Sequence, residues 1–258
     1  MLVMRKRDAF AQMAVDEAIL DGVVEGSSEE TIRFFDFSPP AITIGRLQKI
    51  EDIDEHFCRK NRIDIVRRLT GGRAVVHSGD FTFSLIIKRN NPIFGGGIYK
   101  TYRSVSASFL FALKLLNVPA EWQKVKQAQR EGETSYSSYS PLCFSSVSRY
   151  ELTVRKKKIL GVSQYRKKDA ILVQGSLPIE KPLGIFFDLY PPDRFFSIKE
   201  SGNKDIGFES FSVSLRNGME KINSINLVTG KLSSMEIERT NILKGKYCLN
   251  NWNYRKIR

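Results

Sequence analysis

The chain has 258 residues, 41% of them hydrophobic and 27% charged, which is typical of one globular domain with or without a small appendage and excludes a disordered or fibrous protein. Its 41 Lys and Arg residues against 28 Asp and Glu give a formal net charge of +13, which attracts acidic partners such as nucleic acid or an acidic carrier protein. The sequence lacks a zinc-finger spacing and an aromatic RNP-type strand, which argues against nucleic acid.

Cysteine usage and hydropathy indicate the compartment. Cys58, Cys143 and Cys248 are widely spaced and predict neither a disulfide framework nor a metal knuckle. The first twenty residues carry acidic side chains where a signal peptide needs an apolar run, and no stretch approaches about 18 uncharged apolar residues. We therefore expect a cytoplasmic protein without a membrane span.

The first third of the chain alternates helix and strand patterns. Apolar residues at helical spacing predict an amphipathic helix over about 8–24. Two β-rich runs, 31–37 and 41–45, flank a Ser-Pro-Pro turn, and a short helix over 51–61 carries acids at its start and bases at its end. The runs on either side of "TGGR" predict a β-hairpin within 63–77.

The rest of the chain groups its strands and helices in separate runs. A strand over 81–88 precedes a long helix over 99–117, and the polar, serine-rich stretch 126–149 indicates a long loop. Three strands and then two helices follow, over 150–154, 157–166, 170–179, 211–223 and 233–247. This mixed order predicts an α+β fold with mixed or antiparallel sheets flanked by helices.

The stretch "RRLTGGRAVVH", residues 67–77, places two arginines and two adjacent glycines between β-rich runs. Gly71 and Gly72 permit positive φ and close backbone approach, so their N–H groups suit a carboxylate, phosphate or thioester oxygen, although a plain tight hairpin explains the same glycines. Arg67 and Arg68 are adjacent on a strand and point to opposite faces, so at most one enters a given pocket.

Three side chains could carry chemistry. Cys143 ends the serine-rich loop beside basic groups, where a thiol can serve as a nucleophile, and the alternative is a buried small hydrophobe. Lys158 opens an apolar strand, from which an ammonium can reach a cleft. His77 is either a hydrogen-bonded structural residue or a base. Cys58 and Cys248 are interpreted as structural.

Six stretches follow one another along the chain: "QMAVDEAIL", "PPAITIGRLQ", "RRLTGGRAVVH", "KKILGVSQYR", "VQGSLPI" and "MEIERTNILKGKYCLNNWNYR". In this order they resemble the superfamily of biotin and lipoate protein ligases and lipoyl-pathway acyltransferases. The resemblance implies the catalytic-domain fold of these enzymes, which is similar to that of class II synthetases. It further implies a single domain over 1–258, with its core at about 28–215 and a C-terminal helical extension at about 230–258.

Arg73 separates two branches of the superfamily. Ligases that use ATP and free lipoate commonly have a third glycine at this place, whereas "TGGRAV" together with "CFSSVSRYEL" resembles the LipM-type octanoyltransferases. These enzymes move octanoate from acyl carrier protein to a lipoyl-domain lysine through a cysteine thioester. The chain departs from the family at Gln174, where a histidine is usual.

The resemblance assigns roles by position. Cys143 matches the nucleophile and Lys158 its partner lysine. The residues implied to bind substrate are Arg68, Thr70, Gly71, Gly72, Arg73, Ala74, His77, Gly161, Gly175 and Ser176. Metal ligands are not expected.

A thioester is already activated, so we expect no cofactor. The expected partners are octanoyl-acyl carrier protein and a lipoyl-domain acceptor such as the glycine-cleavage H protein, with no nucleic acid and no membrane. Two alternatives stay open: an ATP-dependent lipoate–protein ligase, which would need ATP and Mg²⁺, and a non-catalytic relative that only binds carrier or lipoyl domains.

Overall fold

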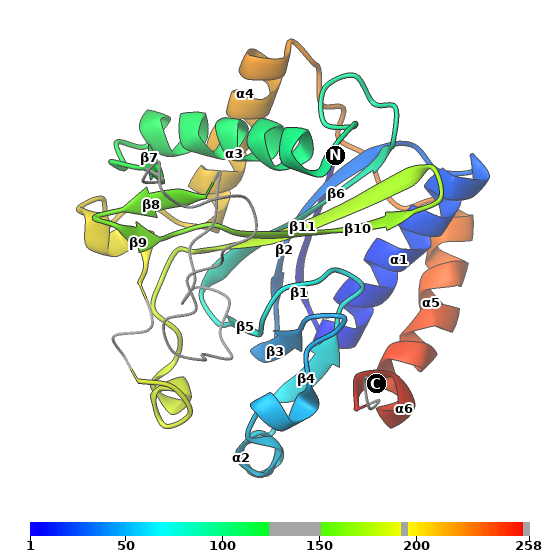
Figure 1. The fold of residues 1–258 in the computed structure, drawn as a ribbon, viewed down its shortest axis with the longest axis vertical. Coiled ribbons are helices and arrows are strands. Elements are labelled where there is room, and N and C mark those ends of the chain that lie inside the picture. The colour runs from blue at the N-terminus through cyan, green and yellow to red at the C-terminus, as the bar shows by residue number, and fades with distance from the viewer. Residues whose placement is uncertain (124–150, 192–195, 255–258) are drawn as a thin grey trace.

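The structure is a computed structural model that describes residues 1–123, 151–191 and 196–254. In this part of the chain, the largest sheet has five strands in the order β1-β2-β6-β11-β10 (Figure 1). Their bounds are β1 (Leu2–Arg7), β2 (Thr31–Phe37), β6 (Asp80–Lys88), β11 (Ala170–Pro178) and β10 (Gly161–Lys167). β1 and β2 run parallel and the other neighbours antiparallel, so the sheet is mixed.

A second sheet has three strands in the order β4-β3-β5, with bounds β3 (Ala41–Ile44), β4 (Asp64–Arg67) and β5 (Val75–His77). β3 lies between the other two strands, parallel to β4 and antiparallel to β5. The predicted hairpin over 63–77 is therefore wrong. The "TGGR" loop connects the two outer strands of this sheet and passes over the end of the central one.

The third sheet is small and consists of β7 (Glu121–Trp122), β8 (Leu152–Val154) and β9 (Lys157–Lys158). The single strand predicted over 157–166 is divided between this sheet and the large one. The chain leaves β9 at Ile159 and Leu160, which are buried in the main core, and enters β10 at Gly161. Burial of these two apolar residues explains the break, because an unbroken strand would turn one of them toward solvent.

Helices cover both faces of the large sheet (Figure 1). On one face lie α3 (Ile98–Leu115) and α4 (Phe208–Asn223), and on the other lies α1 (Ala9–Glu25), with α5 (Ser234–Cys248) packed against α1. The shorter helices are α2 (Glu55–Lys60) and α6 (Asn250–Asn253), and 3₁₀ turns occur at Ile50–Asp52, Gly184–Phe187 and Ile198–Ser201. The arrangement confirms the predicted α+β class with mixed sheets. Among the described residues, we find no helix long and apolar enough to cross a membrane.

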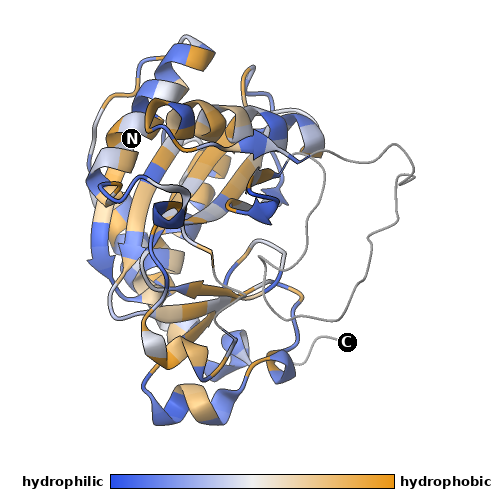
Figure 2. Cartoon of the chain, turned by 90° about the vertical axis from the view of Figure 1, so that its left-hand side faces the viewer, coloured by the Kyte–Doolittle hydropathy of each residue, from blue (hydrophilic) through white to orange (hydrophobic). Residues whose placement is uncertain are grey.

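The main core lies between the large sheet and α3 and α4. Phe81, Phe83, Leu85 and Ile87 alternate along β6 and all pack into this core, which confirms that they share one face. Figure 2 shows hydrophobic residues, in orange, concentrated on the strands and on the helices that cover them. Burial of these apolar side chains removes them from water and is the main favourable contribution to folding.

The first helix differs from its prediction in character rather than in position. Its bounds, Ala9–Glu25, match the expected 8–24, but residues on nearly all its sides are buried. One side meets the sheet and the other meets α5, held by ion pairs of Glu17 with Lys246 and Asp8 with Lys244. The buried Asp16 of this helix accepts a hydrogen bond from Gln174, which lines the site described next. The division into a core and a C-terminal extension stays a prediction.

Candidate active site

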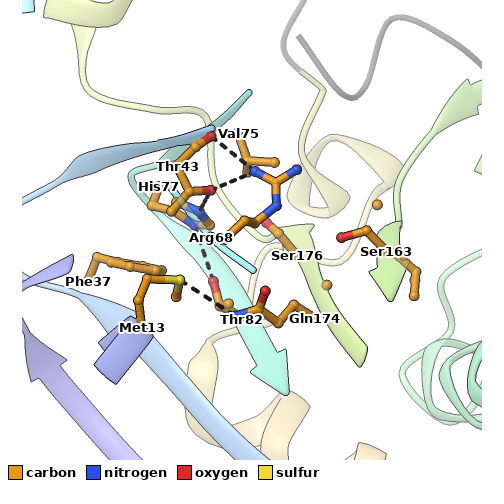
Figure 3. A pocket seen from close by; sticks show the side chains of 13 residues that line it. Met13, Phe37, Thr43, Arg68, Val75, His77, Thr82, Ser163, Gln174 and Ser176 are labelled. Atoms are coloured by element: carbon orange, nitrogen blue, oxygen red, sulfur yellow. Dashed lines mark hydrogen bonds between the residues drawn. The ribbon is translucent and has the colours of Figure 1, made fainter. Parts of the chain in front are cut away.

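A small cavity opens where the five-stranded sheet meets the β4-β3-β5 sheet (Figure 3). Its volume is about 30 Å³. The lining residues come from α1, from four strands of the five-stranded sheet (β2, β6, β10 and β11), from β3 and β5, and from the position directly after β4. They are Met13, Phe37, Thr43, Arg68, Val75, His77, Thr82, Gly161, Val162, Ser163, Gln174, Gly175 and Ser176. Apolar side chains and a few polar groups thus converge on one place, as ligand-binding sites commonly do.

Arg68 forms one wall of the cavity and holds the "TGGR" loop closed. Its Nη1 donates to the carbonyl and the hydroxyl of Thr43, each at 3.1 Å, and its Nη2 donates to the carbonyls of Gly71 at 2.7 Å and Arg73 at 2.8 Å. The neighbouring Arg67 turns the other way and donates to the carbonyls of Gly45, Gln48 and Asn253. The two arginines therefore take opposite faces, which confirms the prediction that only one of them enters the pocket.

A hydroxyl, an imidazole and a carboxylate lie in a row beside Arg68. The Thr43 hydroxyl is 2.9 Å from Nε2 of His77, and Nδ1 of His77 is 2.8 Å from a carboxylate oxygen of Asp80. The ring of Phe37 stacks on the imidazole at 4.0 Å. These contacts fix both the position and the plane of the His77 ring.

Asp80 is held as a carboxylate. Burial alone would raise the pKa of Asp80, but the charge of His77 and hydrogen bonds from His77, Ser176 and Thr82 outweigh burial and lower that pKa below its usual value. Ser176 and Thr82 donate to the same oxygen at 2.6 and 2.8 Å. A fixed negative charge therefore lies directly behind the imidazole.

A second polar chain starts at Ser163 on the opposite wall. Ser163 donates to the Thr70 hydroxyl at 2.9 Å, and Thr70 donates to the side-chain carbonyl of Gln174 at 2.7 Å. The amide of Gln174 then donates to Asp16 at 2.7 Å, and Asp16 also forms an ion pair with the fully buried Arg33. Gln174 therefore connects the cavity to the buried carboxylate of α1.

Only one of the two loop glycines has a backbone conformation that favours glycine. Gly72 has φ of 88°, in the left-handed region that favours glycine, whereas Gly71 does not. The carbonyl of Gly72 also approaches Gly45 so closely that a Cβ on Gly45 would lie 1.9 Å from it. The expectation of positive φ is thus confirmed for Gly72 and wrong for Gly71.

The structure brings five of the predicted substrate-binding residues together in the cavity wall: Arg68, His77, Gly161, Gly175 and Ser176. Thr70 lies just behind that wall, and Gly71, Gly72 and Arg73 form the loop that Arg68 braces. Ala74 is fully buried and packs in the core beneath the β4-β3-β5 sheet. Its position indicates a packing role and gives no direct contact with the cavity.

The two predicted catalytic residues fall elsewhere. Cys143 lies outside the described residues. Lys158 is 7% exposed and its Nζ is 2.5 Å from the carboxylate of Glu151, and it is not among the described residues that line the cavity. Of the other two thiols, Cys58 is buried, and burial together with Asp54 and Glu55 raises its pKa to about 11, which makes its thiol unreactive.

Sequence reasoning missed most of the remaining wall: Met13, Phe37, Thr43, Val75, Thr82, Val162 and Ser163. Gln174 had been noted only as a departure from the family. A usable signal existed for Thr43, because it is the one polar position in the strand Ala41–Ile44. Among the described residues, no group of three or more His, Cys, Asp or Glu side chains could hold a metal ion.

The chain has the catalytic-domain fold of the lipoylation enzymes. The sequence profile of the lipoyl protein ligase A/B catalytic domain matches residues 8–234, and the chain belongs to that family. The octanoyltransferase LipM of an Exiguobacterium species is 37% identical over 70% of this chain and 66% of its own length. That of Halalkalibacterium halodurans is 32% identical over 97% of this chain and 96% of its own.

Solved structures show the same fold. A crystal structure of lipoate-protein ligase A bound with ATP matches 98% of this chain and 97% of its own with a TM-score of 0.81 at 21% sequence identity. The predicted catalytic-domain fold of this superfamily is therefore confirmed.

Proposed function

We propose that this protein is an octanoyltransferase of protein lipoylation. It takes octanoyl from acyl carrier protein and passes it to a lysine of a lipoyl-domain protein. The cavity carries the proposal: five residues from three separate sequence motifs line one pocket between the two larger sheets. Near-full-length similarity to a protein named octanoyltransferase LipM supports the same reaction.

The first half of the proposed reaction forms a thioester on the enzyme. The Cys143 thiolate attacks the carbonyl carbon of octanoyl-acyl carrier protein, and the carrier's thiolate leaves. The ammonium of Lys158 favours the thiolate and stabilises the developing oxyanion. Its ion pair with Glu151, at 2.5 Å, supports this role because it holds the lysine in one orientation.

The cavity is the proposed entrance of the acyl slot. Each buried CH₂ of the chain contributes about 0.8 kcal/mol, so eight carbons gain several kcal/mol over a short acyl group. We propose that a side chain of the wall moves when the octanoyl chain enters this cavity of about 30 Å³. Met13 is suited to this, because its unbranched thioether changes rotamer easily.

The second half of the reaction needs an acceptor. Enzymes of this family modify lipoyl domains, and we propose the glycine-cleavage H protein as the acceptor.

The donor is an acidic carrier protein, which the net charge of +13 attracts and brings to the enzyme faster. We place the reaction in the cytoplasm.

The test is an intact mass measurement after incubation with octanoyl-acyl carrier protein, with and without ATP. We expect an octanoyl adduct without ATP on the wild type and on the control Cys248→Ala, whose thiol lies exposed at the end of α5. Cys143→Ala should give no adduct. Absence of the adduct on the wild type, or its persistence on Cys143→Ala, would refute the covalent mechanism, and modification only with free acid and ATP would indicate a ligase.

A further inference from the structure

His77 carries the one imidazole among the described side chains that line the cavity. The other lining side chains are apolar, hydroxyl, amide or guanidinium groups, or glycine. Arginine stays protonated in proteins and cannot act as a base. An imidazole exchanges a proton in the physiological range. If a reaction in this cavity needs a base, His77 is therefore the described residue that can act as that base.

In the neutral form of His77, its hydrogen bonds place the lone pair of Nε2 toward the Thr43 hydroxyl, which lines the cavity. Asp80 can only accept, so Nδ1 of His77 donates to it at 2.8 Å. Thr43 accepts from Arg68 at 3.1 Å, which leaves its own proton for Nε2 of His77 at 2.9 Å. The tautomer follows from these partners. It makes the Thr43 hydroxyl a bridge from the cavity to the basic nitrogen.

The surroundings also suit a protonated imidazole. Among the described residues, the charged groups that face His77 are Asp80, on β6, and Arg68, which reaches it through the Thr43 hydroxyl. The carboxylate of Asp80 stabilises an imidazolium directly, and the ring of Phe37, stacked at 4.0 Å, offers its face to the same charge. The arrangement follows the logic of acid, imidazole and hydroxyl in serine hydrolases, in which the carboxylate orients and stabilises the base.

The proposed reaction needs such a base in its second half. The acceptor lysine has an ordinary pKa of about 10.4, so at neutral pH its amine is almost entirely the unreactive ammonium. The acyl-enzyme step needs no such deprotonation of an amine. A base in the cavity would therefore accelerate transfer to lysine and leave acyl-enzyme formation unaffected.

We propose, on the basis of the proposed function, that His77 is the general base for the acceptor lysine and acts through the hydroxyl of Thr43. The lysine ammonium gives one proton to the Thr43 oxygen while the Thr43 proton moves to Nε2 of His77. The neutral amine attacks the octanoyl carbonyl carbon, the C–N bond forms and the C–S bond to Cys143 breaks. The second amine proton goes to the departing sulfur, and the imidazolium later releases its proton to solvent.

The experiment separates the two half-reactions. The enzyme is first loaded with octanoyl-acyl carrier protein and the adduct followed by intact mass, and the loaded enzyme is then mixed with a lipoyl domain in a single turnover. We expect His77→Asn, whose amide still donates to Asp80, to load normally and to transfer about 100- to 10,000-fold more slowly. Thr43→Val should likewise load normally and transfer slowly. Thr43→Ser, which keeps the hydroxyl, should transfer at the wild-type rate.

Ser84→Ala is the matched control. Ser84 lies on β6, as Asp80 does, and donates to the buried carboxylate of Asp16 at 2.5 Å, but it is outside the described cavity wall. We expect it to leave both half-reactions unchanged. Transfer at the wild-type rate by His77→Asn, or equal slowing of loading and transfer, would overturn the role of His77 alone. A wild type that never forms the adduct would overturn the proposed function and the base together.

Discussion

Asn253 of α6 hydrogen-bonds both backbone and side chain of Arg67, which lies 186 residues earlier at the end of β4. Its Oδ1 accepts from the Arg67 N–H at 2.9 Å and its carbonyl accepts from the guanidinium. The indole of Trp252 adds a bond to the Arg67 carbonyl at 2.8 Å. The C-terminal segment therefore fixes the residue next to Arg68, and with it one wall of the cavity.

Removal of the hydrogen bonds between Asn253 and Arg67 should lower the stability of the fold. We expect Asn253→Ala to lower the free energy of unfolding by about 1–3 kcal/mol, because the buried N–H of Arg67 and the carbonyl of Tyr247 lose their partner. Urea unfolding followed by circular dichroism measures the change. The exposed Asn250, in the same helix, gives the control Asn250→Ala, and an equal loss in both variants would contradict the specific role of Asn253.

The two glycines of the "TGGR" loop should differ in their tolerance of alanine. Gly72→Ala places a Cβ at φ of 88° and should destabilise the fold by about 1–2 kcal/mol, because the left-handed region is unfavourable for L-residues. Gly71→Ala meets no atom within 4 Å and has no positive φ, so it should be close to neutral. Thermal melts of the two variants make the comparison, and a larger loss for Gly71→Ala would refute this account of the loop.

The local elements of the fold could be predicted because each leaves a local pattern. The alternation of Phe81, Phe83, Leu85 and Ile87 identified the buried face of β6, and the adjacency of Arg67 and Arg68 correctly assigned them to opposite faces. The wrong prediction of a hairpin over 63–77 shows the limit of such local patterns. β3 inserts between β4 and β5, and pairing between strands distant in sequence depends on tertiary packing that no short pattern contains.

The site was predictable only where a motif marked it. His77 was singled out by its residue type and Gly175 through the family resemblance, whereas Met13 and Ser163 line the same cavity from segments about 150 residues apart without a local signal. Cys143 lies outside the described residues and stays a prediction. The sequence marks Gln174 as the position where the family usually has histidine, but only the three-dimensional structure shows that its side chain bonds Thr70 and Asp16.

Gln174 should be replaceable by histidine but not by leucine. Its amide donates to Asp16 at 2.7 Å and its carbonyl accepts from Thr70 at 2.7 Å. An imidazole also offers one donor and one acceptor, whereas a leucine offers neither and leaves the buried Asp16 short of a partner. We expect a loss of about 1–3 kcal/mol for Gln174→Leu and a much smaller loss for Gln174→His, measured by urea unfolding. Equal losses would show that the bridge does not stabilise the fold.

Stability should depend on pH through Asp80. The pKa of Asp80 is lower in the folded protein than in the unfolded chain, where it is about 3.9. Its ionised form therefore contributes stability that is fully present above the unfolded pKa and is lost as the pH falls through the folded pKa. Asp80→Asn cannot ionise, so it should be clearly less stable than the wild type at neutral pH, and the difference should shrink as the pH falls below about 3.9.

Denaturant unfolding at a series of pH values measures that difference directly. The exposed Asp205 supplies the control, because Asp205→Asn removes a carboxylate without removing buried hydrogen bonds from His77, Ser176 and Thr82. We expect the Asp205→Asn curve to follow the wild type at every pH. A gap between wild type and Asp80→Asn that stays constant into acid would mean that Asp80 stabilises the fold through its shape and neutral hydrogen bonds. The negative charge behind the His77 imidazole would then contribute nothing to folding.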